Sequence, residues 1–213
     1  MKIKGVITGD IVKSSKIKAE HKDTLISVIN ELKTDVSSIS NIDIEFFRGD
    51  SFQILVKEVE NTLLVAILLR AKLRGSQLEI KCDARISIGI GSVEYINPSV
   101  ILSDGEAFRS SGRGLDEIGK KKRLVISTPW QTINSELAIS TPFADDIISK
   151  WTKEQAEIIF ISLLTDKTQK AISETLDKTA QNVSKLLNAA KEQLIKPYIN
   201  RFVELIKPNC DGE

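Results

Sequence analysis

The sequence has few of the side chains that bind zinc or form disulfides. Its 213 residues include two cysteines, Cys82 and Cys210, and one histidine, His21. The cysteines are far apart and have no metal-ligand spacing, so neither a zinc site nor a disulfide framework is expected. This cysteine usage predicts a reducing, cytoplasmic setting.

Long hydrophobic runs are also missing. No uninterrupted apolar stretch approaches the roughly 20 residues needed to span a bilayer, and the most apolar segment, TLLVAILLRAKL at 62–73, contains charges. The residues before Asp10 are too few and too charged for the core of a secretory leader. We expect neither a membrane partner nor export.

An excess of charge of one sign is the third absence. The 30 basic and 29 acidic side chains leave a formal net charge of +1. No global field therefore attracts nucleic acid or an anionic membrane, and binding to a polyanion requires a local patch. With 41% hydrophobic and 28% charged residues the chain is expected to fold, as one large or two small domains.

Hydrophobic periodicity in the first 127 residues alternates between strand and helix patterns. The predicted strands are 3–8, 42–47, 51–56, 84–90 and 124–127, and the predicted helices are 21–36, 60–74 and 106–118. Gly89 and Gly91 permit a close backbone approach to the fourth strand. The order β-α-β-β-α-β-α-β predicts an α+β domain of the ferredoxin-like kind.

The segment 127–143 contains Pro129 and Pro142 and has weak periodicity, which indicates a boundary between domains. Beyond it the pattern predicts helices at 152–164, 168–176, 179–195 and 198–206, with Pro197 separating the last two. We predict one domain at 1–135 and an all-α domain at 142–208.

Two carboxylates are the strongest chemical signal. Asp10 ends the first strand and Asp50 lies at the tip of the following hairpin, and these strands are neighbours in a ferredoxin-like sheet. Paired hard oxygen ligands suit Mg²⁺ or Mn²⁺ and phosphoryl or nucleotidyl chemistry. The alternative is structural, because Gly-Asp in a hairpin is usually only a turn.

Four blocks, in order, resemble the class III nucleotidyl cyclase and palm-polymerase superfamily, which includes the GGDEF domains. They are VITGDIVKS (6–14), FFRGDSFQ (46–53), RISIGIG (85–91) and GEAFRSSGRGL (105–115), within residues 1 to about 127. The opening ITGDIVKSS and the FRGDSF hairpin resemble more narrowly the bacterial SatD-like proteins, which add a helix-turn-helix tail.

The resemblance implies a role for each matched position. Asp10 and Asp50 would hold the metal, and Arg113 would occupy the transition-state arginine position, with Arg109 one turn before it as a second candidate catalytic residue. The residues implied in nucleotide or phosphate binding are Ile11, Val12, Lys13, Ser14, Arg48 and Gly49. The chain departs from the cyclase pattern in having Arg109 where cyclases have asparagine and Phe46 where they have the purine-selecting lysine.

The segment 168–190 resembles the helix-turn-helix of bacterial regulators. Ile172 and Leu176 bury the first helix, Asp177-Lys178 make the turn, and Thr179 caps the second. The candidate DNA-binding residues are Thr179, Gln181, Asn182, Ser184, Lys185 and Asn188. A packing or dimerisation role for the same helices remains an alternative.

The two motif sets together favour a ligand-responsive regulator that binds a nucleotide or phosphorylated ligand with Mg²⁺ or Mn²⁺ in the first domain and DNA through the second. The first alternative is a Mg²⁺- or Mn²⁺-dependent nucleotidyl transferase or cyclase, so enzymatic activity stays open. The second is an assembly module without a ligand. Because class III cyclases build each site between two subunits, the resemblance implies a homodimer.

Overall fold

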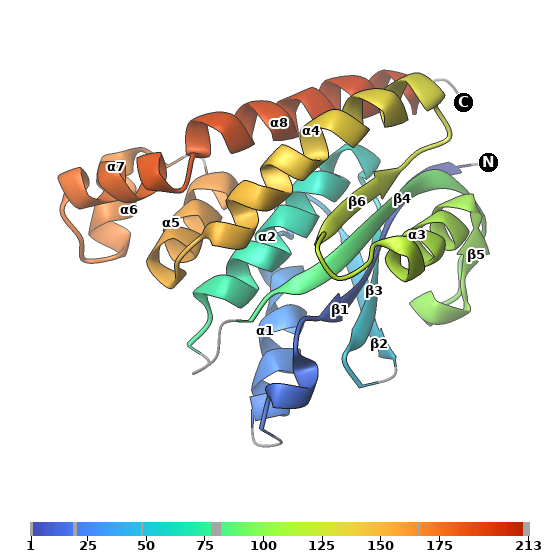
Figure 1. Ribbon diagram of the computed structural model, residues 1–213, viewed down its shortest axis with the longest axis horizontal. Helices are drawn as coiled ribbons and strands as arrows, with labels where there is room; N and C mark the ends of the chain where they lie inside the picture. The colour runs from blue at the N-terminus through green and yellow to red at the C-terminus, as the bar shows by residue number, and fades with distance from the viewer. Residues whose placement is uncertain (1, 19–20, 48, 78–81, 166, 211–213) are drawn as a thin grey trace.

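A curled sheet forms the centre of the protein, described by a computed structural model over residues 2–18, 21–47, 49–77, 82–165 and 167–210. In these ranges the strands are β1 (Lys2–Ile11), β2 (Ile42–Phe47), β3 (Ser51–Val56), β4 (Ala84–Tyr95), β5 (Asp104–Gly105) and β6 (Leu124–Ser127). Their order is β2-β3-β1-β4-β5, and β6 pairs with β4. All neighbours are antiparallel except β4 and β6, which are parallel (Figure 1).

Helices α1 (Lys22–Asp35) and α2 (Thr62–Gly75) connect these strands on one face of the sheet. A βαββαβ unit with the antiparallel order β2-β3-β1-β4 has the ferredoxin-like topology. Helix α3 (Glu106–Glu117) covers the opposite face, where Thr8 of β1 and Ser111 share a buried hydrogen bond of 2.8 Å. The α+β architecture and the order of elements along the chain predicted from the sequence are confirmed, and the two-residue β5 is an addition to that order.

Alternation along β4 separates its two faces. Ile86, Ile88 and Ile90 face α2 and belong to the main core, whereas the residues between them face α3. On that side a Cβ at Gly89 would lie 2.2 Å from the carbonyl oxygen of Ala107. Only glycine allows α3 to lie this close to the sheet, as the pattern predicted.

The tail consists of α4 (Gln131–Lys150), α5 (Lys153–Leu164), α6 (Gln169–Thr175), α7 (Ala180–Ala189) and α8 (Glu192–Ile206). Helix α4 was not predicted: it runs through most of the segment 127–143, where the pattern indicated a domain boundary, and includes Pro142. The proposed break at Pro197 is wrong, since this residue lies inside α8 and the chain turns at Lys191 instead, with φ of 60°.

Both prolines are tolerated for the same reason. A proline inside a helix leaves the carbonyl four residues earlier without its helical partner. Here those residues are Ala138 and Gln193, which are exposed, as are Pro142 and Pro197 themselves. Water can therefore bind the released carbonyls. The division into 1–135 and 142–208 stays a prediction, and α4 occupies the residues between the two parts.

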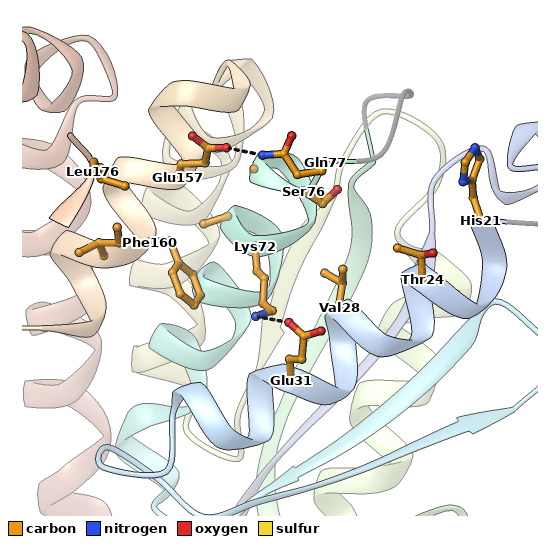
Figure 2. Close-up of a pocket in the computed structure, with 13 residues that line it drawn as sticks. His21, Thr24, Val28, Glu31, Lys72, Ser76, Gln77, Glu157, Phe160 and Leu176 are labelled. Atoms are coloured by element: carbon orange, nitrogen blue, oxygen red, sulfur yellow. Dashed lines mark hydrogen bonds and ion pairs between the residues drawn. The ribbon is translucent and has the colours of Figure 1, made fainter. Parts of the chain in front are cut away.

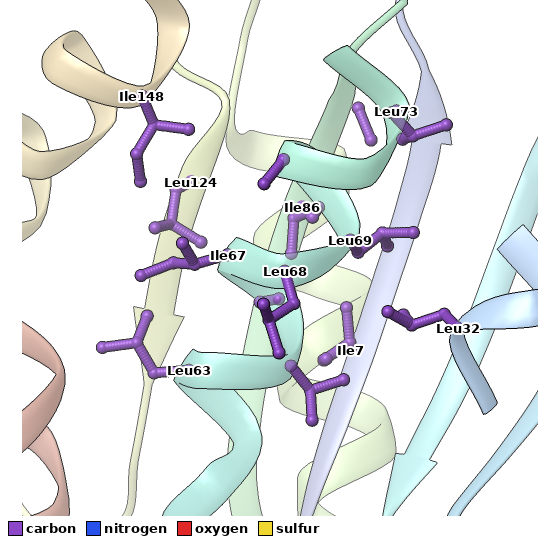
Figure 3. Close-up of a cluster of buried hydrophobic side chains, with 14 of the residues drawn as sticks. Ile7, Leu32, Leu63, Ile67, Leu68, Leu69, Leu73, Ile86, Leu124 and Ile148 are labelled. Atoms are coloured by element: carbon purple, nitrogen blue, oxygen red, sulfur yellow. The ribbon is translucent and has the colours of Figure 1, made fainter. Parts of the chain in front are cut away.

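Helix α2 is buried over most of its surface, as Figure 3 shows for Leu63, Ile67, Leu68, Leu69 and Leu73. One side packs on the sheet around Ile7 and Ile86, and the other packs against tail helices, including Ile148 of α4. A helix that is hydrophobic all round is expected where both sides are covered. The main core is consequently one cluster with members from Ile7 to Ile206.

Arg70 is the fully buried charge of α2, whereas Lys72 and Arg74 near its end are partly exposed. Its side chain is 0% exposed, and its guanidinium donates to both carboxylate oxygens of Asp83 at 2.9 Å and to Asp145 at 2.7 Å. Ser149 accepts a further bond at 2.8 Å. Burial opposes the ionisation of Asp83 most strongly, but the charge and hydrogen bonds of Arg70, with smaller contributions from Arg74 and the N–H of Ala84, outweigh it and lower the pKa of Asp83.

We expect Arg70→Met to destabilise the protein by about 3–5 kcal/mol, because it leaves the buried Asp145 without its cation and the buried Asp83 with Arg74 and Arg123 only. The free energy of unfolding, measured in urea, tests this. Arg201→Met is the matched control, since Arg201 also donates to both oxygens of a carboxylate, that of Glu136, but is 53% exposed. It should cost at most about 1 kcal/mol, and equal losses for the two variants would contradict the expectation.

Candidate functional site at the end of β1

The end of β1 brings an acid and a base together across the sheet. Asp10 lies opposite Ser51 of β3 and opposite Arg85 of β4. Nε of Arg85 donates to Oδ1 of Asp10 at 2.9 Å, and Nη2 donates to Oδ2. The side chain of Asp10 is 19% exposed and that of Arg85 is 33% exposed, so the pair is accessible to a ligand.

Asp50 is held separately, by the turn that follows β1. The hydroxyl of Ser14 donates to Oδ2 of Asp50, and the N–H of Ile11 donates to the Asp50 carbonyl at 3.1 Å. Lys13 takes a left-handed conformation, with φ of 60°, before a short 3-10 turn at Ser14–Lys16. The hairpin tip and this turn therefore form one connected surface.

Arg85 links the two carboxylates electrostatically. Its hydrogen bonds to Asp10, together with the charges of Asp10 and Asp50, outweigh partial desolvation and raise the pKa of Arg85. Its Nη1 also donates to the carbonyl of Gly119 at 3.2 Å. Arg85 therefore carries a fixed positive charge at this end of the sheet.

The sequence did not single out Arg85, although a signal was present. Arg85 is the charged residue at the start of an alternating apolar strand, and Asp10 is the charged residue at the end of another. When two such strands pair antiparallel, opposite charges at these positions become cross-strand partners. Because the register of β1 and β4 was unknown, this partnership was missed.

The residues predicted to bind phosphate do not all present donors. The N–H groups of Ile11 and Val12 already donate to the carbonyls of Asp50 and Asp83, at 3.1 and 2.8 Å. Lys13 is exposed and Ser14 is partly exposed, and Gly49 is exposed with φ of 79°. The predicted residue Arg48 lies outside the described residues.

A divalent metal does not fit the carboxylates as they are arranged. Both oxygens of Asp10 accept from Arg85, and one oxygen of Asp50 accepts from Ser14. Within the described ranges, no group of three or more His, Cys, Asp or Glu side chains is placed to hold a metal. The prediction of Mg²⁺ or Mn²⁺ at Asp10 and Asp50 remains a prediction, because binding requires Arg85 to release Asp10.

The two candidate catalytic arginines lie on α3. Arg109 is 47% exposed and pairs with Glu94 and Asp104, at 2.6 and 2.9 Å. Glu94 is nine residues beyond Arg85 along β4, which corresponds to about 30 Å of strand. Arg113 is also exposed, and its neighbour Gly114 packs near Ser87. Within one chain, Arg109 is therefore not brought to Asp10.

A cavity of about 230 Å³ lies beside Asp50, on the α1 side of the hairpin. Its apolar lining comes mainly from Ile17, Leu25, Ile26 and Phe46, and Lys22 joins Ser14 and Asp50 as polar lining. The cavity is smaller than the roughly 300–1,000 Å³ typical of drug-sized ligands. Its size suits a single flat ring.

The predicted DNA-binding residues lie on α7. The hydroxyl of Thr179 accepts from the N–H of Asn182 at 3.2 Å, which confirms the predicted helix cap. Val183 and Leu187 are buried and pack α7 against the rest of the tail. The exposed candidates are Thr179, Gln181, Asn182, Lys185 and Asn188, and Ser184 is partly exposed.

The fold and the site define an α+β protein with a ferredoxin-like sheet and a charged cluster at one end. No protein-family model and no curated protein matches the chain. Among the helices in the described ranges, none combines the length and apolar character needed to cross a membrane.

Solved structures similar to this chain are nucleotidyl cyclase domains. They include the active GGEEF domain of a diguanylate cyclase from Vibrio cholerae, with 14% identity, a TM-score of 0.42, and coverage of 61% of this chain and 85% of that one. A bacterial light-regulated adenylyl cyclase has 12% identity, a TM-score of 0.43 and coverage of 71% and 81%. The guanylyl cyclase Cya2 has 15% identity, a TM-score of 0.42, and coverage of 64% of this chain and 78% of that one. Because each TM-score is below 0.5, no activity of this chain follows from these likenesses.

We expect Arg85→Met to raise the affinity for Mn²⁺ by about tenfold or more, a change of about 1.4 kcal/mol, because it releases both oxygens of Asp10. Electron paramagnetic resonance of free Mn²⁺ measures this. The double variant Arg85→Met, Asp10→Asn should lose the gain. An unchanged affinity in Arg85→Met would show that the ion pair does not control access to Asp10.

Proposed function

We propose that the ferredoxin-like part binds a nucleotide, or a related phosphorylated ligand, at the end of β1, and that the tail binds DNA, so that the protein is a ligand-responsive regulator. The observation that carries the first half is the joining of a basic turn to a ring-sized cavity. The second half rests on the exposed face of α7.

The basic turn is the stretch 11–18, IVKSSKIK, which contains three lysines and no acidic residue. Lys13 and Lys16 are exposed, and Lys22 adds a charge at the start of α1. With Arg85 these cations outnumber Asp10 and Asp50. A local positive excess next to serine hydroxyls favours phosphate.

The cavity would bind the base of the nucleotide, whereas the basic turn would bind its phosphates. A flat base fits against Ile26 and Phe46, while a phosphate chain is too large to share the 230 Å³ and would extend over the basic turn. Ser14 belongs to both the turn and the cavity lining, so one ligand could contact both.

In this proposal a divalent metal competes with Arg85 for the carboxylate of Asp10. A metal–nucleotide complex would offer the arginine a phosphate in place of Asp10, and the freed carboxylate would become available to the metal. Mg²⁺ or Mn²⁺ would then depend on the nucleotide for binding.

Isothermal titration of the four nucleoside triphosphates and of pyrophosphate, with Mg²⁺ or Mn²⁺, tests the ligand site. We expect the double variant Lys13→Ala, Lys16→Ala to weaken both ligand types by about tenfold, because each phosphate contact loses a charged donor. Ile26→Trp, which fills the cavity, should weaken the nucleotide and leave pyrophosphate unchanged. Asn30→Trp is its control, on an exposed position of the same helix. If the wild type binds neither ligand type, this half of the proposal is wrong.

Charge supports the proposed DNA contact. The segment 178–191 contains Lys178, Lys185 and Lys191 and no acidic residue. Its exposed amides, Gln181 and Asn182, are side chains that can donate and accept on base edges. The lysines on this face form a local basic patch, which can attract DNA phosphates although the whole chain is nearly neutral.

We expect Lys185→Ala to weaken binding to duplex DNA and to reduce the dependence of log K on log salt by about one unit, since one phosphate contact is lost. Gel shifts with random-sequence duplexes between low and moderate salt measure both quantities. Lys150→Ala, an exposed lysine near the end of α4, should change neither. Absence of any shift with wild-type protein at low salt would remove the DNA half.

A nucleotidyl transferase or cyclase activity remains the alternative for the same site. It requires Arg113, and with it Arg109, near the transferred phosphate, and a single chain leaves Arg109 at the other end of β4. This alternative therefore includes the homodimer implied by the cyclase resemblance, in which α3 of a second copy would supply the arginine.

A further inference from the structure

A second and larger cavity, of about 570 Å³, lies between α1, α2 and α5, next to the end of α6. Figure 2 shows Val28 and Thr24 of α1 on one side and Phe160 and Leu176 on the other, with Lys72 of α2 between them. It shares no lining residue with the cavity beside Asp50. The two are separate sites.

The larger cavity has the character of a small-molecule site. Its volume lies within the roughly 300–1,000 Å³ of ligand pockets, which are mostly apolar with a few polar groups. The apolar walls come from Val28, Ala71, Phe160, Ile161 and Leu176. They lie on helices of the sheet unit and of the tail alike.

Its one lining lysine is already neutralised. Nζ of Lys72 lies 3.2 Å from Oε2 of Glu31 and 2.6 Å from Oδ2 of Asp35, and it is 5.6 Å from the centre of the Phe160 ring. The hydrogen bond from Lys72 is the main cause that lowers the pKa of Glu31, so this carboxylate stays ionised. An anionic ligand would have to displace two carboxylates from Lys72.

Glu157 supplies the excess negative charge. It lines the cavity from α5 and points toward Gln77, beyond the end of α2, whose amide donates a long hydrogen bond of 3.4 Å to it (Figure 2). The amide oxygen of Gln77 accepts from Lys153 at 2.6 Å, and Lys153 is not among the lining residues. The lining therefore carries two carboxylates, Glu31 and Glu157, against the ammonium of Lys72, with Asp35 behind the lysine and His21 at the rim, at the start of α1. A cation is attracted to such a site and an anion is repelled.

We propose that this cavity binds a small organic cation with an apolar body, an amphipathic amine. The apolar body lies against Val28, Ile161 and Leu176, and the ammonium group lies toward Glu157, near the Phe160 ring. The site is independent of the nucleotide site and differs from it in the sign of its charge.

Three matched probes test the proposal on the full chain by isothermal titration: 4-phenylbutylamine, 4-phenylbutan-1-ol and 4-phenylbutyrate. We expect the amine to bind at least tenfold more tightly than the carboxylate, with the alcohol between them. Glu157→Gln should weaken the amine and leave the alcohol unchanged. The proposal is overturned if no probe binds, or if the carboxylate binds as tightly as the amine.

Two variants place the binding in the cavity. Val28→Trp fills it and should abolish amine binding, whereas Asn30→Trp, on the exposed face of α1, should not. Thr24→Trp obstructs the exposed rim and serves where Val28→Trp fails to fold, as judged by circular dichroism. Undiminished amine binding in a folded cavity variant would also overturn the proposal.

Discussion

The buried guanidinium of Arg70 is the interaction on which the rest of the molecule depends. It joins α2 to Asp83, immediately before β4, and to Asp145 of α4, so three segments meet at one charge. A buried charge is costly unless it is fully paired and hydrogen-bonded, and Arg70 meets this requirement with its two carboxylates and Ser149. The network thereby favours one position of the tail relative to the sheet.

That position explains why α2 is apolar over most of its surface. The sheet covers one side and tail helices cover the other, so the residues from Leu63 to Leu73 are buried, Arg70 included, except for the partly exposed Leu64 and Lys72. The same stacking leaves the larger cavity between α1, α2 and α5. A ligand there would contact the sheet unit and the tail together, and would stabilise their association by its binding free energy.

The charged end of the sheet depends on strand register in the same way. Antiparallel pairing places Asp10 opposite Arg85, and the hairpin tip is tied to the turn after β1 through Ser14. Because arginine is always protonated, it is a built-in cation for Asp10. The arrangement favours an anionic ligand over a bare metal ion, which is why the basic turn carries the functional proposal and the carboxylate pair does not.

The sequence by itself determined the local elements: the periodicities of β1 to β4 with α1 and α2, the approach at Gly89, and the cap at Thr179. It also pointed to Asp10 and Asp50, through their places at strand ends. Only the tertiary structure decided their partners. Asp10 with Arg85, and Arg70 with Asp145, are each 75 residues apart in the chain, so no local pattern reports them. Helix α4 was missed for a related reason, since the cost of its proline depends on solvent at Ala138, which is a property of packing.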